Sequence, residues 1–402
     1  MGTTGFWSYF SSLVKTMNLS QIKNRIMFID VVLYIHKYVI GIRKSGNDIK
    51  LENNKNITHI HAMYKIIKPF IDLNILPICV FDGKAPNSKE ETIEKRKENI
   101  EINIEKCNKL KENNIDECDE EYIKYFKRSF VLTTEMINEC KQFLDNLGLP
   151  YVNSIGEADP QCAGLSHYYE NYCAGVYSED SDIILNGANI LMRDLNLKNN
   201  TISYITKDSI IKFLQDKCDL ITKKYNLKKQ IINHQVLLNF SHIMGNDYCN
   251  GIRCSGGNNR DKLFEIFVCC NFDVELFVEI IYEMNKDKIL FYIPEDFLIK
   301  WKISINIFEN IKIINPSDIN LNLTKIDHKK INYFLQKNEF KNELIKNIID
   351  SIDILYENYY QTMKQLNINF NDNSKINNFT NDNVTNDNEW HTVGHKKKKY
   401  AK

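Results

Sequence analysis

Residues 25–30 read RIMFID, a short apolar run that ends on a carboxylate. The same pattern returns at residues 75–82, ILPICVFD, and at residues 172–182, YCAGVYSEDSD. Short apolar runs of this kind are typical of buried β-strands. Between the first two runs, residues 57–73 carry apolar side chains at helical spacing, which indicates an amphipathic helix. Strands that alternate with helices predict an α/β fold with a mainly parallel central sheet flanked by helices.

Carboxylates stand at the ends of these runs, where open α/β sheets form their sites. Taken singly, an acid after a strand is explained as a turn former or a helix N-cap. An acid in the first turn of a helix is explained by the helix dipole. The acids that stand out together by their position are Asp30, Asp82, Glu157, Asp159, Asp180, Asp182 and Asp247.

Acids that converge from several strands need a compensating charge. Two like charges at close range repel by several kcal/mol, even at an effective dielectric constant of about 20. Such a cluster persists only with raised pKa values or with bound cations. Ligands that are all oxygen favour Mg²⁺ or Mn²⁺ over zinc. Two such ions can activate a water and stabilise the leaving oxygen of a phosphodiester, so the set predicts a two-metal hydrolytic site.

The composition narrows the class of protein. The 402 residues include 52 Lys and Arg against 52 Asp and Glu, and a net charge of zero leaves nucleic-acid binding to a local basic face. The 11 cysteines form no C-x-x-C pair, which argues against a zinc site or a disulfide framework and fits a reducing, intracellular setting. We find no secretory signal and no apolar run of membrane-spanning length, so we expect no membrane partner.

Three stretches lack the strand pattern. Residues 84–127 are dense in Lys, Glu and Asn, and the pattern alone predicts a solvated insertion. Residues 286–366 show helical patterns without a motif and are expected to form a C-terminal helical region. Residues 367–402 are rich in Asn, so we expect disorder. They include a lysine run at 396–399. Its alternative roles are contact with nucleic acid, a nuclear localisation signal, or a charged terminus that only aids solubility.

Seven segments carry a family resemblance through their order and spacing. They read MGTTGFW, FIDVVLYIHKY, PICVFDGKAPNSKEETIEKRKE, LTTEMINECKQFLDNLGLPYV, GEADPQCAGL, YSEDSDIILNG and IMGNDYCNGIRCSGG. In this order they resemble the flap endonuclease, or XPG-type, family of 5′ nucleases, over about two thirds of the chain. The resemblance implies a PIN-like 5′ nuclease fold. Its N-terminal region would cover residues 1–135 with a helical arch at about 84–127, and its internal region would cover residues 136–285 with a helix–two-turn–helix segment at about 236–270.

The resemblance also assigns roles to the acids and to two cations. The first metal ion would be bound by Asp30, Asp82, Glu157 and Asp159, and the second by Asp180, Asp182 and Asp247. Lys89 and Arg96 would lie on the first helix of the arch, contact the scissile phosphate and stabilise its developing charge. On this basis the segment at 84–127 is an arch that admits a single strand, which replaces the interpretation as a solvated insertion.

DNA contacts are implied at four further positions. Gly2 would lie where the N-terminus approaches the DNA, and His36 stands where the family carries a tyrosine that stacks on a base. Gly256 and Gly257 would offer backbone N–H groups to duplex phosphates. Two departures, Cys254 for a glycine and Asn258 for a basic residue, weaken the case for a potassium-assisted grip on the duplex.

The sequence thus predicts a metal-dependent, structure-specific 5′ nuclease with two Mg²⁺ or Mn²⁺ ions. It would act on DNA flaps, nicks or branched intermediates in replication, repair or recombination. A 5′→3′ exonuclease or a junction resolvase of the same fold is the alternative, and an inactive nucleic-acid-binding scaffold is an alternative of another class, against which the retained acids argue. We expect a monomer without a sliding-clamp motif, located in the nucleus or in a viral replication compartment.

Overall fold

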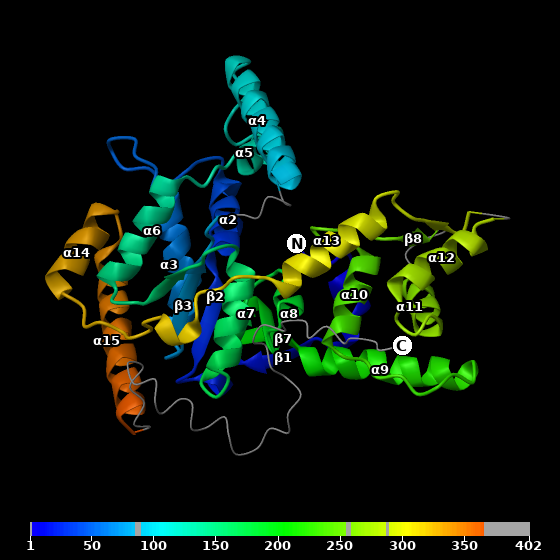
Figure 1. The fold of residues 1–402 in the computed structure, drawn as a ribbon. Helices are drawn as coiled ribbons and strands as arrows, with labels where there is room; N and C mark the ends of the chain where they lie inside the picture. Colours follow the sequence, from blue (N-terminus) through cyan, green and yellow to red (C-terminus); the bar gives the residue numbers. More distant parts are fainter. Residues whose placement is uncertain (1, 85–89, 255–258, 287–288, 366–402) are drawn as a thin grey trace.

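The computed structural model describes residues 2–84, 90–254, 259–286 and 289–365 (Figure 1). Its centre is a seven-stranded sheet with the strand order β1-β7-β6-β5-β2-β3-β4. The strands are β1 (Lys15–Asn18), β2 (Ile26–Asp30), β3 (Leu76–Phe81), β4 (Tyr151–Asn153), β5 (Cys173–Tyr177), β6 (Ile190–Asn196) and β7 (Thr201–Thr206). The pairs from β6 through β5, β2 and β3 to β4 are parallel, whereas β7 pairs antiparallel with both β6 and β1. This sheet confirms the predicted fold class.

The three sequence runs with terminal acids form the middle of the sheet. Every residue of β2, β3 and β5 is buried, because helices cover the sheet. α2 and α3 pack on each other and on β3, and α6 packs on α3, while α7 packs against β2, β3 and β5. These helices are α2 (Val31–Ile42), α3 (Thr58–Ile71), α6 (Thr134–Asn146) and α7 (Ala158–Tyr168). Shorter elements of the same part are α1 (Phe6–Tyr9), η1 (Ser11–Leu13), η2 (Leu19–Ile22), η3 (Arg43–Ser45) and α8 (Asp182–Leu185).

Two charged helices project from this body at the top of Figure 1. They are α4 (Glu90–Glu112) and α5 (Glu120–Arg128), and we call them the projecting helix pair. Arg43 fixes the base of the pair. Its guanidinium lies 4.4 Å from the ring centroid of Phe126 and 4.9 Å from that of Phe130, and it forms two hydrogen bonds of 2.7 and 2.8 Å with Asp48. A cation that is buried between rings and paired with a carboxylate is a rigid support.

A second group of helices follows β7 on the right of Figure 1. It comprises α9 (Lys207–Lys224), α10 (His234–Met244), α11 (Arg260–Cys269), α12 (Val274–Met284) and α13 (Phe297–Glu309), with the strand pair β8 (Arg253–Cys254) and β9 (Phe291–Tyr292). Tyr9 and Asp261 tie this group to the N-terminal segment, because the tyrosine hydroxyl donates to the carboxylate at 2.8 Å. α11 therefore lies beside the first residues of the protein.

After α13 the chain returns across the body, and residues 314–365 pack on helices and loops around the sheet. Gln161 of α7 exchanges two hydrogen bonds with the backbone of Ile314, at 2.8 and 3.1 Å. Farther along, the backbone N–H of Thr324 donates to the carbonyl of Gly148 at 3.0 Å. The segment ends in η5 (Pro316–Asp318), α14 (His328–Lys337) and α15 (Asn342–Gln365), of which α14 contacts α6 and α15 contacts α3. The described residues of the predicted C-terminal region thus pack on both earlier regions.

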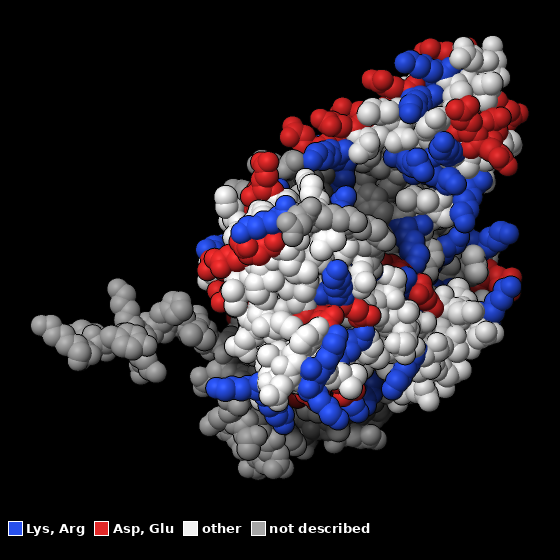
Figure 2. All heavy atoms as spheres, turned by 90° about the vertical axis from the view of Figure 1, so that its right-hand side faces the viewer, with Lys and Arg blue, Asp and Glu red and all other residues white. Residues whose placement is uncertain are grey.

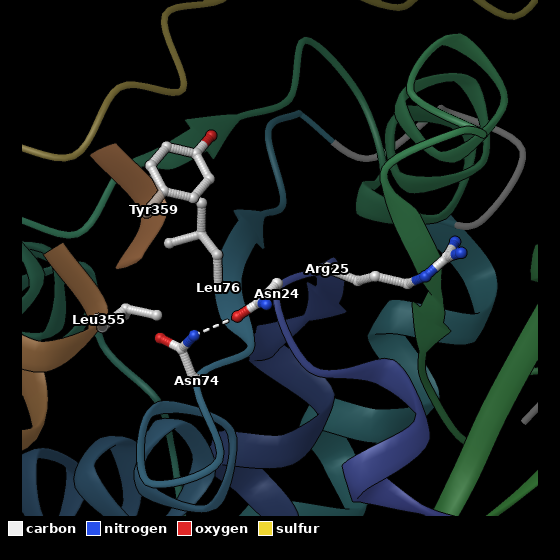
Figure 3. A pocket seen from close by; sticks show the side chains of 6 residues that line it. All are labelled: Asn24, Arg25, Asn74, Leu76, Leu355 and Tyr359. Carbon is white, nitrogen blue, oxygen red and sulfur yellow. Dashed lines mark hydrogen bonds between the residues drawn. The ribbon is translucent and has the colours of Figure 1, made fainter. Parts of the chain in front are cut away.

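A small pocket lies at the opposite end of the sheet from the acids (Figure 3). Its lining residues are Asn24, Arg25, Asn74, Leu76, Leu355 and Tyr359. The first four lie at the starts of β2 and β3, whereas Asp30 and Asp82 lie at the ends of these strands. The Asn74 amide donates a hydrogen bond to the side-chain oxygen of Asn24. Because β2 and β3 lie side by side, the length of one strand separates this pocket from the acidic residues.

In the part of the chain that the structure describes, we find no helix with the length and apolarity needed to cross a membrane.

His242 joins α10 to α13 inside the core and gives the fold a pH dependence. The side chain is fully buried, its Nδ1–H donates to the carbonyl of Leu238 at 2.7 Å, and its Nε2 accepts from the hydroxyl of Ser304. Because the carbonyl can only accept, Nδ1 carries the proton, and burial favours the neutral ring, whose Nε2 then accepts from the serine. Burial lowers the pKa of His242 to about 4.

We expect this histidine to make the protein unstable in mild acid. In the unfolded chain His242 titrates near pH 6.5, so the free energy of unfolding should fall as the pH drops from 6.5 toward 4, by about 2 kcal/mol at pH 5 for this one group. Urea unfolding at pH 7 and pH 5 measures the change. His242→Gln should lose that part of the pH dependence, whereas His328→Gln, at an exposed histidine that pairs with Asp353, should keep it. Equal pH dependence in both variants would contradict the assignment.

Candidate active site

Asp30, the last residue of β2, lies at the centre of the acidic residues. It is 6% exposed and accepts a hydrogen bond of 2.9 Å from the hydroxyl of Ser178, which follows the neighbouring strand β5. Although Asp30 precedes α2, its side chain makes no capping hydrogen bond with that fully described helix. The structure therefore does not support the N-cap explanation of this acid.

The charges of three other predicted acids reach Asp30. Its pKa is raised to about 8, first by burial and then by the charge of Asp82, with smaller contributions from Asp180 and Glu157. The hydrogen bond from Ser178 opposes this shift without cancelling it. These three acids follow β3, β4 and β5. Because their charges act on Asp30 at the end of β2, all four acids lie at the carboxyl edge of the sheet.

A close approach of two backbone segments places Asp82 beside the start of α7. The N–H of Gly83 donates to the carbonyl of Gly156 at 2.6 Å, and a Cβ on Gly83 would lie 2.1 Å from the carbonyl oxygen of Ser154, so a larger residue cannot fit there. Asp82 in turn accepts a hydrogen bond of 2.8 Å from the N–H of Ala158. This contact brings Asp82 next to Glu157 and to Asp159, which lies in the first turn of α7.

Asp180 and Asp182 are held by the turn that follows β5. The N–H of Asp180 donates to the Ser178 hydroxyl at 3.0 Å, and the N–H of Asp182 donates to the Asp180 carboxylate at 3.0 Å. Both acids are buried, at 5% and 3% exposure. The N-terminal segment packs against this turn, because a Cβ on Gly2 would lie 2.2 Å from Oδ1 of Asp180. Gly2 therefore lies against the acids, where a side chain would collide with them.

Asp247 and Arg96 connect the acids to the projecting helix pair. The Arg96 guanidinium lies 3.8 Å from the Asp247 carboxylate, and its side chain is 55% exposed. The pKa of His36 is lowered by burial and then by the charge of Arg96, so His36 also lies on this side of the site. Its ring meets the Phe130 ring edge-on at 5.4 Å. Of the other predicted contacts, Lys89, Gly256 and Gly257 lie outside the described residues.

The charge pattern of this face is uneven (Figure 2). Lys and Arg side chains gather around the hollow beneath the projecting helix pair, and acidic side chains cover much of its outer part. The first turns of α4 carry Lys95, Arg96 and Lys97, whereas residues 116–121 carry mostly acids. A chain with no net charge thus has a local basic surface next to a group of carboxylates.

The candidate ligands are all carboxylate oxygens, which favour a hard cation such as Mg²⁺ over zinc. Their mutual repulsion is relieved when a cation binds. As they stand, the described residues contain no group of three or more His, Cys, Asp or Glu side chains arranged to hold a metal ion. The acids that act on Asp30 nevertheless follow neighbouring strands and lie at one edge of the sheet.

Sequence reasoning missed two polar side chains that hold these acids. Ser178 donates to Asp30, and the hydroxyl of Tyr248 donates to the Glu157 carboxylate at 2.5 Å. Only their place in the sequence could have drawn attention to them. Ser178 directly follows the apolar residues of the third run, and Tyr248 directly follows Asp247. That place does not say which carboxylate either hydroxyl reaches.

Comparison with known proteins agrees with this geometry. The family model described as the XPG N-terminal domain matches residues 1–102, and the one described as the XPG I-region matches residues 148–247. Flap endonuclease 1 of Debaryomyces hansenii is 28% identical over 335 residues, which cover 83% of this chain and 82% of that protein. Human flap endonuclease 1 is 24% identical, over 83% of this chain and 81% of the relative.

Solved structures show the same fold. The catalytic core of Rad2 in complex with DNA substrate superposes with a TM-score of 0.57 at 19% identity, over 87% of this chain and 99% of that one. Flap endonuclease-1 from Methanococcus jannaschii gives a TM-score of 0.57 at 22% identity, over 87% and 98% of the two chains. At this level of identity the likeness concerns the fold alone.

We expect Asp30→Asn to stabilise the metal-free protein. Because the folded-state pKa of Asp30 is raised, its contribution to stability is complete below pH 4 and is lost as the pH rises through about 8. At pH 8 with a chelator, the neutral amide should raise the free energy of unfolding by about 1–3 kcal/mol, which urea unfolding measures.

Asp261→Asn is the matched control, with the opposite expected sign. Burial alone would raise the pKa of Asp261, but hydrogen bonds from Lys217 and Tyr9 outweigh burial and hold that pKa below its usual range. The amide should therefore destabilise the protein at that position. A loss of stability in Asp30→Asn would show that Asp30 is not under repulsion.

Proposed function

We propose that this chain, which belongs to the flap endonuclease and XPG family of structure-specific 5′ nucleases, hydrolyses the backbone of DNA flaps, nicks or branched intermediates with two divalent cations, Mg²⁺ or Mn²⁺. The observation that carries the proposal is the electrostatic contact of Asp82, Asp180 and Glu157 with the buried Asp30. A group of carboxylates of this kind needs cations to keep its charge.

The family resemblance divides the acids into two sets. Asp30, Asp82, Glu157 and Asp159 would hold the first ion, and Asp180, Asp182 and Asp247 would hold the second. When bound, divalent cations lower the pKa of water and neutralise the charge that develops on a phosphate. The chain itself orients the acids, since Ser178 holds Asp30 and the N–H of Ala158 holds Asp82.

Arg96 would bind and orient the scissile phosphate from the opposite side. Its guanidinium is half-exposed and lies 3.8 Å from the Asp247 carboxylate, on a helix that carries Lys95 and Lys97 on either side of it in sequence. A planar guanidinium matches the geometry of phosphate oxygens and favours the charge that grows on them during hydrolysis. The resemblance gives Lys89 the same role, and Gly2 and His36 would border the path of the DNA.

The remaining expectations concern the setting of the reaction. We infer an intracellular enzyme that acts as a monomer in the nucleus or in a viral replication compartment. The lysine run at 396–399 supports a nuclear address. The sequence shows no sliding-clamp motif, so the structure of the DNA itself would select the substrate.

Cleavage of a 5′-labelled flap in Mg²⁺ tests the proposed reaction. Asp180→Ala should reduce the single-turnover rate to the metal-free background, because Asp180 belongs to the buried set. Asp216→Ala, which removes an exposed acid of α9, should cleave like the wild type. A wild type that binds branched DNA but never cuts it, in Mg²⁺ or in Mn²⁺, would favour the scaffold. Products from a flap with a blocked 5′ end would favour the junction resolvase.

Removal of the arginine tests the role of the projecting helix pair. Arg96→Ala should lower the single-turnover rate by about 10²-fold or more, the effect of deleting one preorganised donor. The matched control is Lys97→Ala, which removes a neighbouring exposed cation of the same helix and should change the rate little. Equal losses in the two variants would assign the effect to the general charge of α4 and would contradict a specific phosphate contact.

A further inference from the structure

A half-buried tyrosine reaches one of the candidate metal-binding acids from a distant part of the chain. Tyr248 follows α10, Glu157 precedes α7, and the tyrosine hydroxyl donates to Oε2 of Glu157 at 2.5 Å. The hydrogen bond therefore crosses the acidic edge of the sheet and joins two regions that are 91 residues apart in sequence. Tyr248 itself is not an acid and had no role in the predicted site.

The hydrogen bond has a fixed direction. An ionised carboxylate can only accept a hydrogen bond, so the tyrosine hydroxyl is the donor. A carboxylate is planar, so a fixed Oε2 also fixes the direction in which Oε1 points. Outer hydrogen bonds of this kind orient the carboxylates that bind metal ions.

α13 supports the tyrosine from behind. The ring of Phe308 meets the ring of Tyr248 edge-on at 5.5 Å, and it also meets the ring of His242 at 5.8 Å. His242 is bonded to Ser304 of the same helix. The main-chain N–H of Tyr248 donates to the side-chain oxygen of Asn246 at 3.0 Å. The tyrosine is thus held at its backbone, at its ring and at its hydroxyl.

We propose that Tyr248 is a positioning residue, whose hydroxyl fixes the Glu157 carboxylate in the direction that binds a divalent cation, while Phe308 of α13 holds the tyrosine ring. The inference rests on the proposed metal-dependent function. It also gives the segment after residue 285 a role, because α13 lies in that segment and braces the site through one aromatic contact.

Tyr248→Phe removes the hydroxyl and keeps the ring, and it is tested in the full chain. The chain offers a matched control, Tyr225→Phe, because the hydroxyl of Tyr225 donates to Glu265 at 2.9 Å on the surface, away from the acids. Titration calorimetry with Mn²⁺ and without DNA should show about 10-fold weaker binding for Tyr248→Phe, with wild-type affinity for the control. Phe308→Leu keeps the hydroxyl but loosens the ring, so it should weaken Mn²⁺ binding by a smaller factor.

Two further measurements separate positioning from structural support. The thermal midpoint of Tyr248→Phe should stay near that of the wild type, and its cleavage rate should recover as Mn²⁺ rises, with an unchanged KM for DNA. Wild-type Mn²⁺ affinity together with a lowered thermal midpoint would overturn the proposal and leave Tyr248 a purely structural role. A wild-type chain that neither binds Mn²⁺ nor cleaves DNA would instead overturn the proposed function, so the two failures are distinguishable.

Discussion

Repulsion of the buried Asp30 carboxylate by the acids around it is the constraint on which the rest of this structure depends. Three neighbouring parallel strands end on acids, and parallel strands bring their carboxyl ends to the same edge. Burial and the nearby charges of Asp82, Asp180 and Glu157 raise the pKa of Asp30 to about 8. An arrangement that costs folding energy in the absence of cations is expected where charge is needed for function. The fully buried β2, β3 and β5 supply the stable frame that tolerates it.

The acids are held by groups from distant parts of the chain. Ser178 after β5 bonds Asp30, the N–H of Ala158 bonds Asp82, and Tyr248 after α10 bonds Glu157. The N-terminal segment contributes as well, since the N–H of Thr3 donates to the hydroxyl of Ser181 at 2.8 Å between two of the acids. The site is therefore a property of the assembled fold, because Asp30, Asp82 and Glu157 each depend on a partner that another element positions.

Local sequence patterns located the strands and the acids, but not their partners. The runs at 25–30, 75–82 and 172–182 became three central strands, because the pattern of a buried strand is contained within a few residues. The Tyr248–Glu157 bond is different, because no periodicity states where a hydroxyl points. Charge density at residues 84–127 likewise did not reveal what supports the projecting helix pair. The segment looks solvated, yet Arg43, more than 80 residues from Phe126, fixes its base by bonding that residue's carbonyl at 2.9 Å.

The contact between Arg96 and Asp247 explains how a neutral chain can present a cation to DNA. At 3.8 Å, with the arginine side chain 55% exposed, the pair is solvated and contributes about 1 kcal/mol or less. A weak pair exchanges its partner readily, so a phosphate can replace the carboxylate at small cost. On the proposed function, Arg96 would exchange Asp247 for a phosphate when DNA binds, and the Asp247 carboxylate would then be left for a cation. The pair would thus hold Arg96 near the acids in the free protein without a strong bond to break.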